Sequence, residues 1–237
     1  MYFSTTGIFL RTTKYKDNIL IANIFTREYG LVSLMVRRTT KKPLLTQPLT
    51  IVDLVYEMKK NNTIGFIKEC SINYVYKDIL FNNRKLNIVL ILSELMRKLL
   101  KEESVEMFDF IAESLKWLDN NKSTFDNFIN YFLIKFCNIS GIAPEYYGKS
   151  KSLEKAEHLN IKDGVFRRHS FDENDDNKVK WEYGNEIFKL SKLEYHELSN
   201  FKSVGKSEVF EILIKYISAH LYDLKNLKSI EIVKELN

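Results

Sequence analysis

The sequence has little cysteine: only Cys70 and Cys137 occur among its 237 residues. Two cysteines do not make the disulfide framework of a small secreted fold. We therefore expect both thiols to be reduced and to act as small buried apolar groups.

Long hydrophobic runs are also missing, since no apolar stretch approaches the ~18–20 residues that a membrane span requires. The first residues, Met1–Thr6, lack the basic-then-apolar order of a secretory signal. These absences predict a soluble, intracellular protein of the cytoplasm that makes no membrane contact.

Local catalytic motifs are absent as well. Gly205, Lys206 and Ser207 look like the end of a phosphate-binding loop, but Asn200 stands where that loop needs its first glycine. No Gly-x-Ser-x-Gly nucleophile motif is present, and Cys137 lies on an apolar helical face, where a thiolate is disfavoured. We therefore predict a protein that is not an enzyme.

Metal-binding patterns are weak. His158 and His169 have no cysteine pair near them, so the sequence argues against a zinc site. The acidic run Asp172–Asp176 lacks the central glycine and the final glutamate of a calcium loop. A magnesium-dependent nuclease needs several carboxylates that converge on the metal. The acidic residues of the first third are mostly isolated in the sequence: Asp17, Glu28, Asp53, Glu57, Glu69 and Asp78. A nuclease is kept as the enzyme alternative.

The positive charge is unevenly distributed. Residues 1–78 contain twelve Lys and Arg against six Asp and Glu, whereas the remaining residues contain 24 against 25. The whole excess of positive charge therefore lies in the first third of the chain. This asymmetry indicates a basic module for an acidic polymer, attached to a nearly neutral body.

The basic third also reads as five short strands. Alternating and β-branched residues predict strands over Phe3–Thr13, Asn18–Thr26, Leu31–Val36, Leu49–Met58 and Ile64–Cys70. A turn at Glu28–Gly30 relies on Gly30 to take a positive φ. Closing these strands removes exposed edges, so residues 1–80 are predicted to form a five-stranded OB-fold barrel.

Residues 81–237 are predicted to form a helical domain, which makes the chain an α+β protein. Apolar residues recur with helical spacing after Arg84, around Phe108–Leu118, from Phe125 to Cys137, over Lys189–Phe201, over Ser207–Leu224 and over Ser229–Leu236. Ser123 is expected to cap the third helix, which Gly141 and Pro144 end. The polar stretch at about 145–185 is expected to be a loop carrying a two-residue type I′ hairpin at Asp163–Gly164.

The basic residues of the barrel fall at strand ends and on loops. The candidate DNA-binding set is Arg11, Lys14, Lys16, Arg27, Arg37, Arg38, Lys41, Lys42, Lys59 and Lys60. Such charge attracts phosphates without reading sequence. Four interleaved rings could stack on unpaired bases or fill the barrel, and the sequence does not say which: Tyr15, Tyr29, Tyr56 and Phe66. The alternative is an OB-fold scaffold whose basic rim binds an acidic protein.

Several segments resemble the RecO recombination-mediator family in order and spacing. Its opening strands and their "F-T-x-x-x-G" turn resemble Thr6–Tyr15, Asn18–Ile21 and Phe25–Leu31. Its "L-Q-P-L/F" entry into the fourth strand resembles Gln47–Leu49. Gly141–Pro144 resembles its "G-x-x-P" helix end, and Leu227–Lys234 its last segment. The resemblance thus spans nearly the whole chain.

The resemblance implies a DNA repair protein that binds single- and double-stranded DNA, anneals strands and works with RecR to help load RecA on DNA coated by single-strand-binding protein (SSB). It implies contact with the SSB C-terminal tail through the helical body, for which Arg84, Lys85, Arg97, Lys98 and Lys101 are our candidates. RecF could take part indirectly, and the sequence leaves open whether it is needed. The resemblance also implies a location in the bacterial cytoplasm, in association with the nucleoid. Many members carry a four-cysteine zinc site after the "G-x-x-P"; this chain has no cysteine after Cys137, so no metal is expected.

Overall fold

The computed structural model describes residues 1–37, 47–60, 62–146, 157–167, 177–224 and 227. The chain forms two compact units, Met1–Asn120 and Asn121–Asn237. Each unit is described by itself below.

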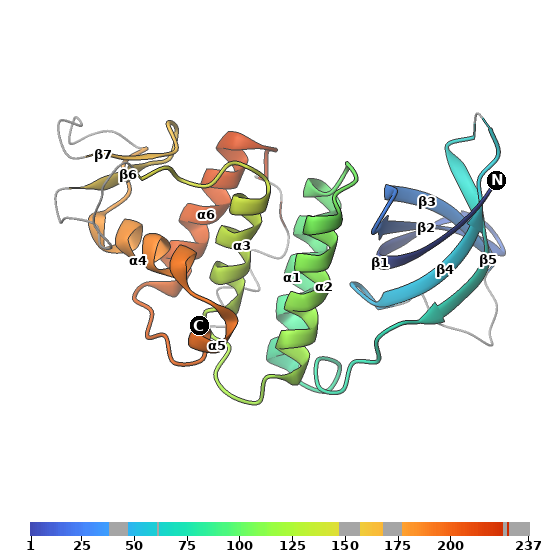
Figure 1. Ribbon diagram of the computed structural model, residues 1–237, viewed down its shortest axis with the longest axis horizontal. Helices are drawn as coiled ribbons and strands as arrows, with labels where there is room; N and C mark the ends of the chain where they lie inside the picture. Colours follow the sequence, from blue (N-terminus) through green and yellow to red (C-terminus); the bar gives the residue numbers. More distant parts are fainter. Residues whose placement is uncertain (38–46, 61, 147–156, 168–176, 225–226, 228–237) are drawn as a thin grey trace. The chain divides into compact units, whose positions relative to one another are not determined.

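The first unit begins with a closed five-stranded barrel (Figure 1). Its strands are β1 (Tyr2–Lys16), β2 (Ile19–Thr26), β3 (Gly30–Arg37), β4 (Ile51–Glu57) and β5 (Ile64–Ile72). The strand order is β1-β2-β3-β5-β4, and β4 closes onto β1. All neighbours are antiparallel except β3 and β5, which are parallel. The α+β class and the five-stranded OB-like barrel predicted from the sequence are therefore confirmed.

Alternate residues of the strands point into the barrel and form its core. Phe9, Ala22, Ile24, Leu34 and Leu54 are among the buried residues of this cluster. The alternation is the reason for the clear sequence pattern, because successive side chains of a strand point to opposite faces. The β2–β3 turn contains Gly30 at φ +62°, as the sequence predicted.

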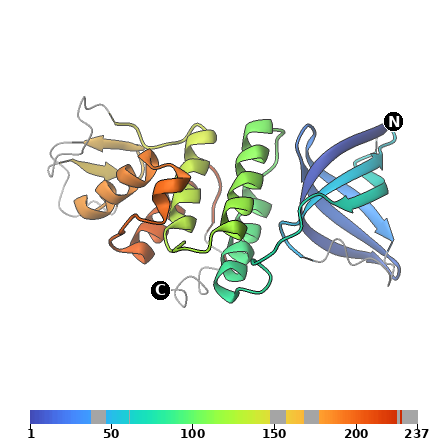
Figure 2. The ribbon, with the colours of Figure 1, turned by 60° about the horizontal axis from the view of Figure 1, so that its bottom comes forward.

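Two helices complete the first unit: α1 (Asn83–Leu99) and α2 (Val105–Asn120). The linker from β5 to α1, drawn in teal in Figure 2, ends at Asn82, whose side chain caps α1 by accepting from the amides of Arg84 and Lys85. Ser93 of α1 donates to the carbonyl of Leu10 in β1, and Phe108 of α2 lies against Phe25 of β2. These helices thus cover part of the outer barrel surface.

The second unit packs α3 (Phe128–Ile139), α4 (Trp181–Lys192) and α6 (Lys206–His220) against one another, with the short α5 (Tyr195–Leu198) between α4 and α6. A two-stranded sheet of β6 (His158–Asn160) and β7 (Val165–Arg167) lies on α4. Tyr146, Phe166 and Phe188 form an aromatic cluster where β7 meets α4.

Three details of the predicted helical part are wrong. The third helix begins at Phe128, because the amide of Ser123 donates to the Asn121 side chain and the chain turns there before the helix starts. The segment Lys189–Phe201 is not one helix: α4 ends at Lys192 and α5 starts at Tyr195.

The Asp163–Gly164 hairpin is the third wrong detail. Asn160 pairs with Val165, so four residues connect the strands, and the amides of Asp163 and Gly164 both donate to Asn160. Among the described residues other than glycine, only Leu49 has a positive φ. A type I′ turn needs a positive φ at both central residues, which excludes that turn here.

Some predicted features lie outside the described residues, namely most of the loop after β3, parts of the 145–185 stretch and the final helix at 229–236. Within the described part of the chain, no helix is both long enough and apolar enough to cross a bilayer.

Candidate nucleic-acid interface

Three of the predicted DNA-binding residues meet at one end of β1, β2 and β3. Lys16 pairs with Ile19 of β2, which in turn pairs with Arg37 of β3. Lys14 pairs with Leu20 in the next row. All three cationic side chains are exposed, and Lys14 forms an ion pair with Asp17 at 3.8 Å. Cross-strand pairing therefore places Lys16 and Arg37 in one row on the outer face, whereas Lys14 lies on the inward face with Leu20 and Val36.

Arg11 lies on the same outer face of the barrel. Its Nε donates to the side-chain oxygen of Asn23 at 3.3 Å, and Asn23 donates to Ser33 at 2.9 Å. The three residues form one row across β1, β2 and β3. This row offers a guanidinium, an amide and a hydroxyl to the solvent side.

Lys59 and Lys60 are exposed in the β4–β5 connection but lie apart from this cluster. Ile64, at the start of β5, is beside Ser33, and β5 runs parallel to β3. The connection that precedes Ile64 therefore lies toward the first residues of β3, whereas Arg37 is its last residue.

Arg27 has a different role. Its guanidinium donates through Nε and Nη2 to both carboxylate oxygens of Asp109 in α2, at 2.8 Å each. This hydrogen bonding holds the pKa of the Asp109 carboxyl below its usual range, although partial burial opposes the shift. Arg27 therefore joins the β2–β3 turn to α2. Arg38, Lys41 and Lys42 lie outside the described residues.

The structure also separates the four candidate rings. Tyr56 is buried in the barrel at 2% exposure, and burial raises the pKa of its hydroxyl to about 12. Tyr29 packs edge-on against Phe3 and Tyr56. Tyr15 and Phe66 are exposed, at 52% and 40%. Tyr29 is also 41% exposed, so burial removes only Tyr56 from the four candidate rings.

The candidates for SSB-tail binding do not form one cluster. Arg84 is in the first turn of α1, whereas Arg97 and Lys98 are in its last turn, about 20 Å away at 1.5 Å per residue. Lys101 follows the helix and is exposed. Lys85 is buried at 1% exposure and is unavailable to a partner.

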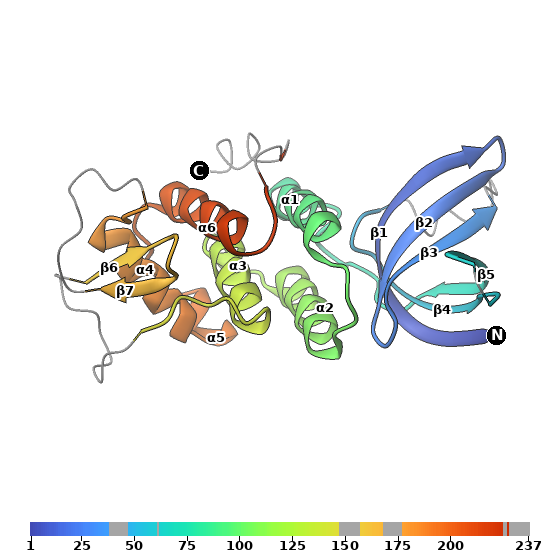
Figure 3. The same cartoon turned by 90° about the horizontal axis from the view of Figure 1, so that it is seen from above.

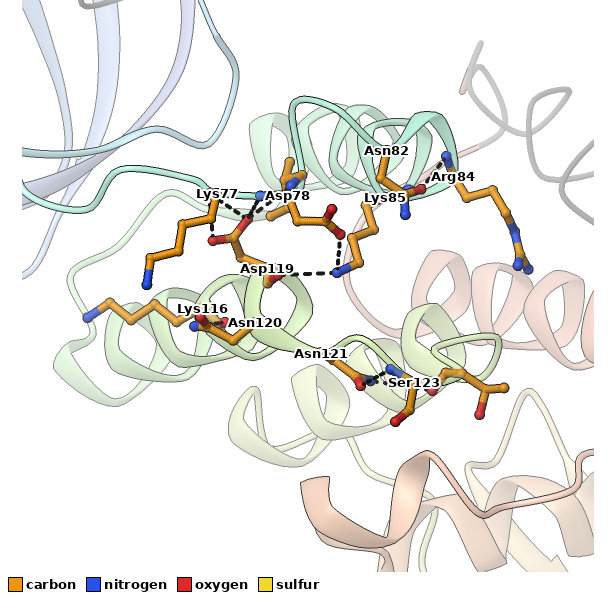
Figure 4. Close-up of polar contacts among 12 residues, drawn as sticks. Lys77, Asp78, Asn82, Arg84, Lys85, Lys116, Asp119, Asn120, Asn121 and Ser123 are labelled. Carbon is orange, nitrogen blue, oxygen red and sulfur yellow. Dashed lines mark hydrogen bonds and ion pairs between the residues drawn. The ribbon is translucent and has the colours of Figure 1, made fainter.

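Lys85 instead belongs to a polar network around Asp119, at the end of α2 (Figure 4). The Asp119 carboxylate accepts the backbone amides of residues 77, 78 and 79 and the Tyr74 hydroxyl, at 2.9–3.1 Å. Lys85 donates to the Asp119 carbonyl and pairs with Asp78 at 2.7 Å. Burial alone would raise the pKa of Asp119, but these hydrogen bonds outweigh it and lower the pKa.

The Asp119 network was not predicted from the sequence. An isolated aspartate near the end of an amphipathic helix looks like any solvated carboxylate. Covariation between residues 74–79 and position 119 could have indicated the network. A single sequence contains no covariation.

Metal-binding clusters are not found in the described residues: none holds three or more His, Cys, Asp or Glu side chains. His158 lies against the Val179 carbonyl, and His169 is outside the described residues. Cys137 is fully buried, and burial raises the pKa of its thiol to about 12. A four-cysteine zinc site does not fit this chain, because its sequence has only two cysteines.

Comparisons with known proteins agree with this architecture. Residues 1–76 match the family described as recombination protein O N terminal, and residues 82–229 match recombination protein O C terminal. A protein of Phocaeicola vulgatus is 28% identical over 251 residues, covering 100% of this chain and 99% of that protein. One of Flavobacterium psychrophilum is 29% identical over 253 residues, with the same coverage. Both are named DNA repair protein RecO.

Proposed function

Because this chain belongs to the recombination protein O (RecO) family of DNA repair proteins, which are not enzymes, we propose that it binds single-stranded DNA through its barrel and anneals complementary strands. We further propose that it works with RecR to help load RecA onto SSB-coated DNA, in association with the nucleoid.

The observation that supports this proposal best is the cationic row at the end of β1, β2 and β3. Lys16 and Arg37 are exposed and lie in one row across the outer face of the sheet. Phosphates held by such charges release condensed counterions, which provides affinity without sequence preference. The β2–β3 face of an OB-fold is also the surface on which this fold accommodates oligonucleotides.

The mechanism needs no nucleotide hydrolysis. Cations that neutralise phosphates on two strands lower the repulsion between them, so that base pairing proceeds once the strands meet. Duplex DNA is held by the same phosphate contacts. Arg38, Lys41 and Lys42 all come within five residues after Arg37 in the chain, and we propose that they extend this surface.

For the partners, we propose RecR and the acidic SSB tail, with RecF acting only indirectly. Arg97 and Lys98, in the last turn of α1, remain our candidates for the tail. Arg84 is kept as a separate candidate, because the length of α1 separates it from the other two.

The test is fluorescence anisotropy of a labelled strand of about 30 nucleotides across a salt series, without metal or nucleotide. The double variant Lys16→Glu, Arg37→Glu should bind all sequences more weakly, with a salt slope shallower by about 1–2, because each lost phosphate contact on a single strand removes about 0.7 from the slope. The matched control is Lys189→Glu, Lys215→Glu, which changes the net charge equally at exposed positions of α4 and α6.

An unchanged slope for the barrel variant, or an equal loss for the control, would show that the DNA lies elsewhere. No binding by the native protein at low salt would favour the acidic-protein scaffold. Loss of the labelled strand only when Mg²⁺ is added would instead favour a nuclease.

A further inference from the structure

The outer face of the barrel has a covered part and an uncovered part. Ile8, Leu10 and Phe25 point outward but are buried, and α1 and α2 supply contacts to them through Ser93 and Phe108. Further along β2 and β3, Ile21 and Met35 also point outward and are only half-buried. An apolar outer surface therefore continues beyond the helices that cover it.

This uncovered part is a continuous row across three strands. Ile21 of β2 pairs with Met35 of β3, and Met35 pairs with Phe66 of β5. Figure 3 shows β2 and β3 side by side. Neighbouring strands are about 4.8 Å apart, so the row extends for roughly 10 Å. We call Ile21, Met35 and Phe66 the apolar row.

Phe66 is the aromatic member of the row, and its ring is 40% exposed. The strand register explains why the ring points outward. Ile67, the next residue, packs against the barrel core, so Phe66 points to the opposite face, where it also pairs with Glu57 of β4. Single exposed apolar residues are common on proteins. An exposed ring aligned with two apolar neighbours is a flat surface on which planar groups can stack.

The rows on either side of the apolar row are polar, and they differ from each other. On one side, Arg37 lies two positions along β3 from Met35, and Lys16 of β1 pairs with Ile19, two positions along β2 from Ile21; both carry positive charge. On the other side lie Asn23 and Ser33, joined by a hydrogen bond. Rows on one face of a sheet are about 7 Å apart. A nucleotide with its base on Met35 therefore has its phosphate within reach of the Arg37 side chain.

We propose that the apolar row stacks unpaired bases of single-stranded DNA and thereby makes the barrel prefer single strands to duplex. This inference rests on the proposed function and adds its specificity element. The bases of a duplex are already stacked inside the helix and present only their edges, so the row contributes to binding of single strands alone. Phosphate contacts at Lys16 and Arg37 serve both forms of DNA.

The test compares Phe66→Ala with the native protein, using a labelled single strand of about 30 nucleotides and the corresponding duplex. Stacking of one base on an aromatic side chain corresponds to a change in affinity on the order of tenfold. Phe66→Ala should therefore bind the single strand about tenfold more weakly, with an unchanged salt slope, and should bind the duplex as the native protein does. Phe81→Ala is the matched control, because Phe81 is an exposed phenylalanine in the β5–α1 linker.

A second variant reports directly on the contact. In Phe66→Trp the new indole should keep single-strand affinity, and bound bases should quench its fluorescence beyond any quenching of the two native tryptophans. Duplex should quench it little.

The outcomes separate the two proposals. The stacking row is refuted, while DNA binding stands, if Phe66→Ala binds each DNA with the same affinity as the native protein. The same holds if the duplex quenches Phe66→Trp as strongly as the single strand does. If the native protein binds neither DNA, both the proposed function and the row are refuted. Loss of single-strand affinity with a retained duplex affinity, and with Phe81→Ala unchanged, supports the row.

Discussion

At the scale of single residues, the same residue type takes opposite roles in the first unit. Arg37 is exposed at the end of β3, whereas Arg27 is held by both carboxylate oxygens of Asp109. Lys85 is almost completely buried and pairs with Asp78. Counting basic residues therefore overestimates the charge that the barrel and α1 offer to a phosphate backbone.

Loss of the Asp119 side chain should destabilise the first unit. Asp119→Ala removes the acceptor of three backbone amides and of the Tyr74 hydroxyl. Hydrogen bonds to a charged group contribute about 1.5–3 kcal/mol, and buried donors left unpaired add a further penalty. We expect the free energy of unfolding to fall by about 3 kcal/mol or more in urea denaturation. Asp17→Ala, at a fully exposed aspartate, should change it by less than about 0.5 kcal/mol, and equal effects of the two variants would contradict this role.

The lowered pKa of Asp119 also predicts a pH dependence. A carboxyl with a pKa below its unfolded value of about 3.9 stabilises the fold fully above that pH. The contribution is lost as the pH falls through the lower folded pKa. The difference in stability between the native protein and Asp119→Ala should therefore shrink below about pH 4. A difference that stayed constant with pH would mean that the charge of Asp119 is irrelevant.

At the scale of elements, the β2–β3 turn is packed tightly against the connection between α1 and α2. Gly30 has φ +62°, and a Cβ at this position would lie 2.7 Å from the backbone nitrogen of Glu103. Both facts exclude a side chain, one through backbone conformation and the other through space.

Gly30→Ala should therefore lower the free energy of unfolding by about 2 kcal/mol or more, because αL strain costs ~1 kcal/mol and the contact with Glu103 adds to it. Gly141→Ala is the matched control: φ is +70° there, but nothing lies within 4 Å of the added Cβ. Thermal and urea unfolding should show the smaller loss for Gly141→Ala. Equal losses would mean that the turn does not press against Glu103.

The elements themselves were predicted to different degrees. The five strands were predicted closely, because each has one face in the core and the other toward solvent or the helices. The start of α3 was missed because Phe125 continues the apolar spacing and is buried, although it lies before the helix. In most amphipathic helices the buried apolar residues are themselves helical. Before α3, by contrast, Phe125 is buried without being part of the helix.

At the scale of the whole molecule, the barrel and its first two helices belong to one compact unit, residues 1–120. The family matches, in contrast, divide the chain between residues 76 and 82. The predicted boundary at residue 80 stays a prediction. Arg27–Asp109, Phe25–Phe108 and the Asp119 network all join the barrel side of that boundary to the helical side.

A fragment of residues 1–120 should therefore unfold cooperatively, whereas residues 1–80 should aggregate or lose a cooperative transition. The shorter fragment exposes the apolar side chains of Ile8, Leu10 and Phe25, each buried in the complete chain, and exposed apolar patches promote association. Circular dichroism during heating and size-exclusion chromatography distinguish the two. A monomeric 1–80 fragment as stable as 1–120 would show that α1 and α2 are dispensable for the barrel.

The sequence by itself determined the class of the fold, the barrel followed by helices, and the location of the excess positive charge, because strand and helix periodicity and net charge are properties of local segments. Tertiary structure alone decided which charges and rings are available. Strand pairing places Lys16 and Arg37 in one row on either side of Ile19 and aligns Phe66 with Met35. Packing of α2 engages Arg27, and burial removes Tyr56 and Lys85 from the surface. The physical reason is that exposure and pairing depend on contacts between residues far apart in the chain, which local patterns do not contain.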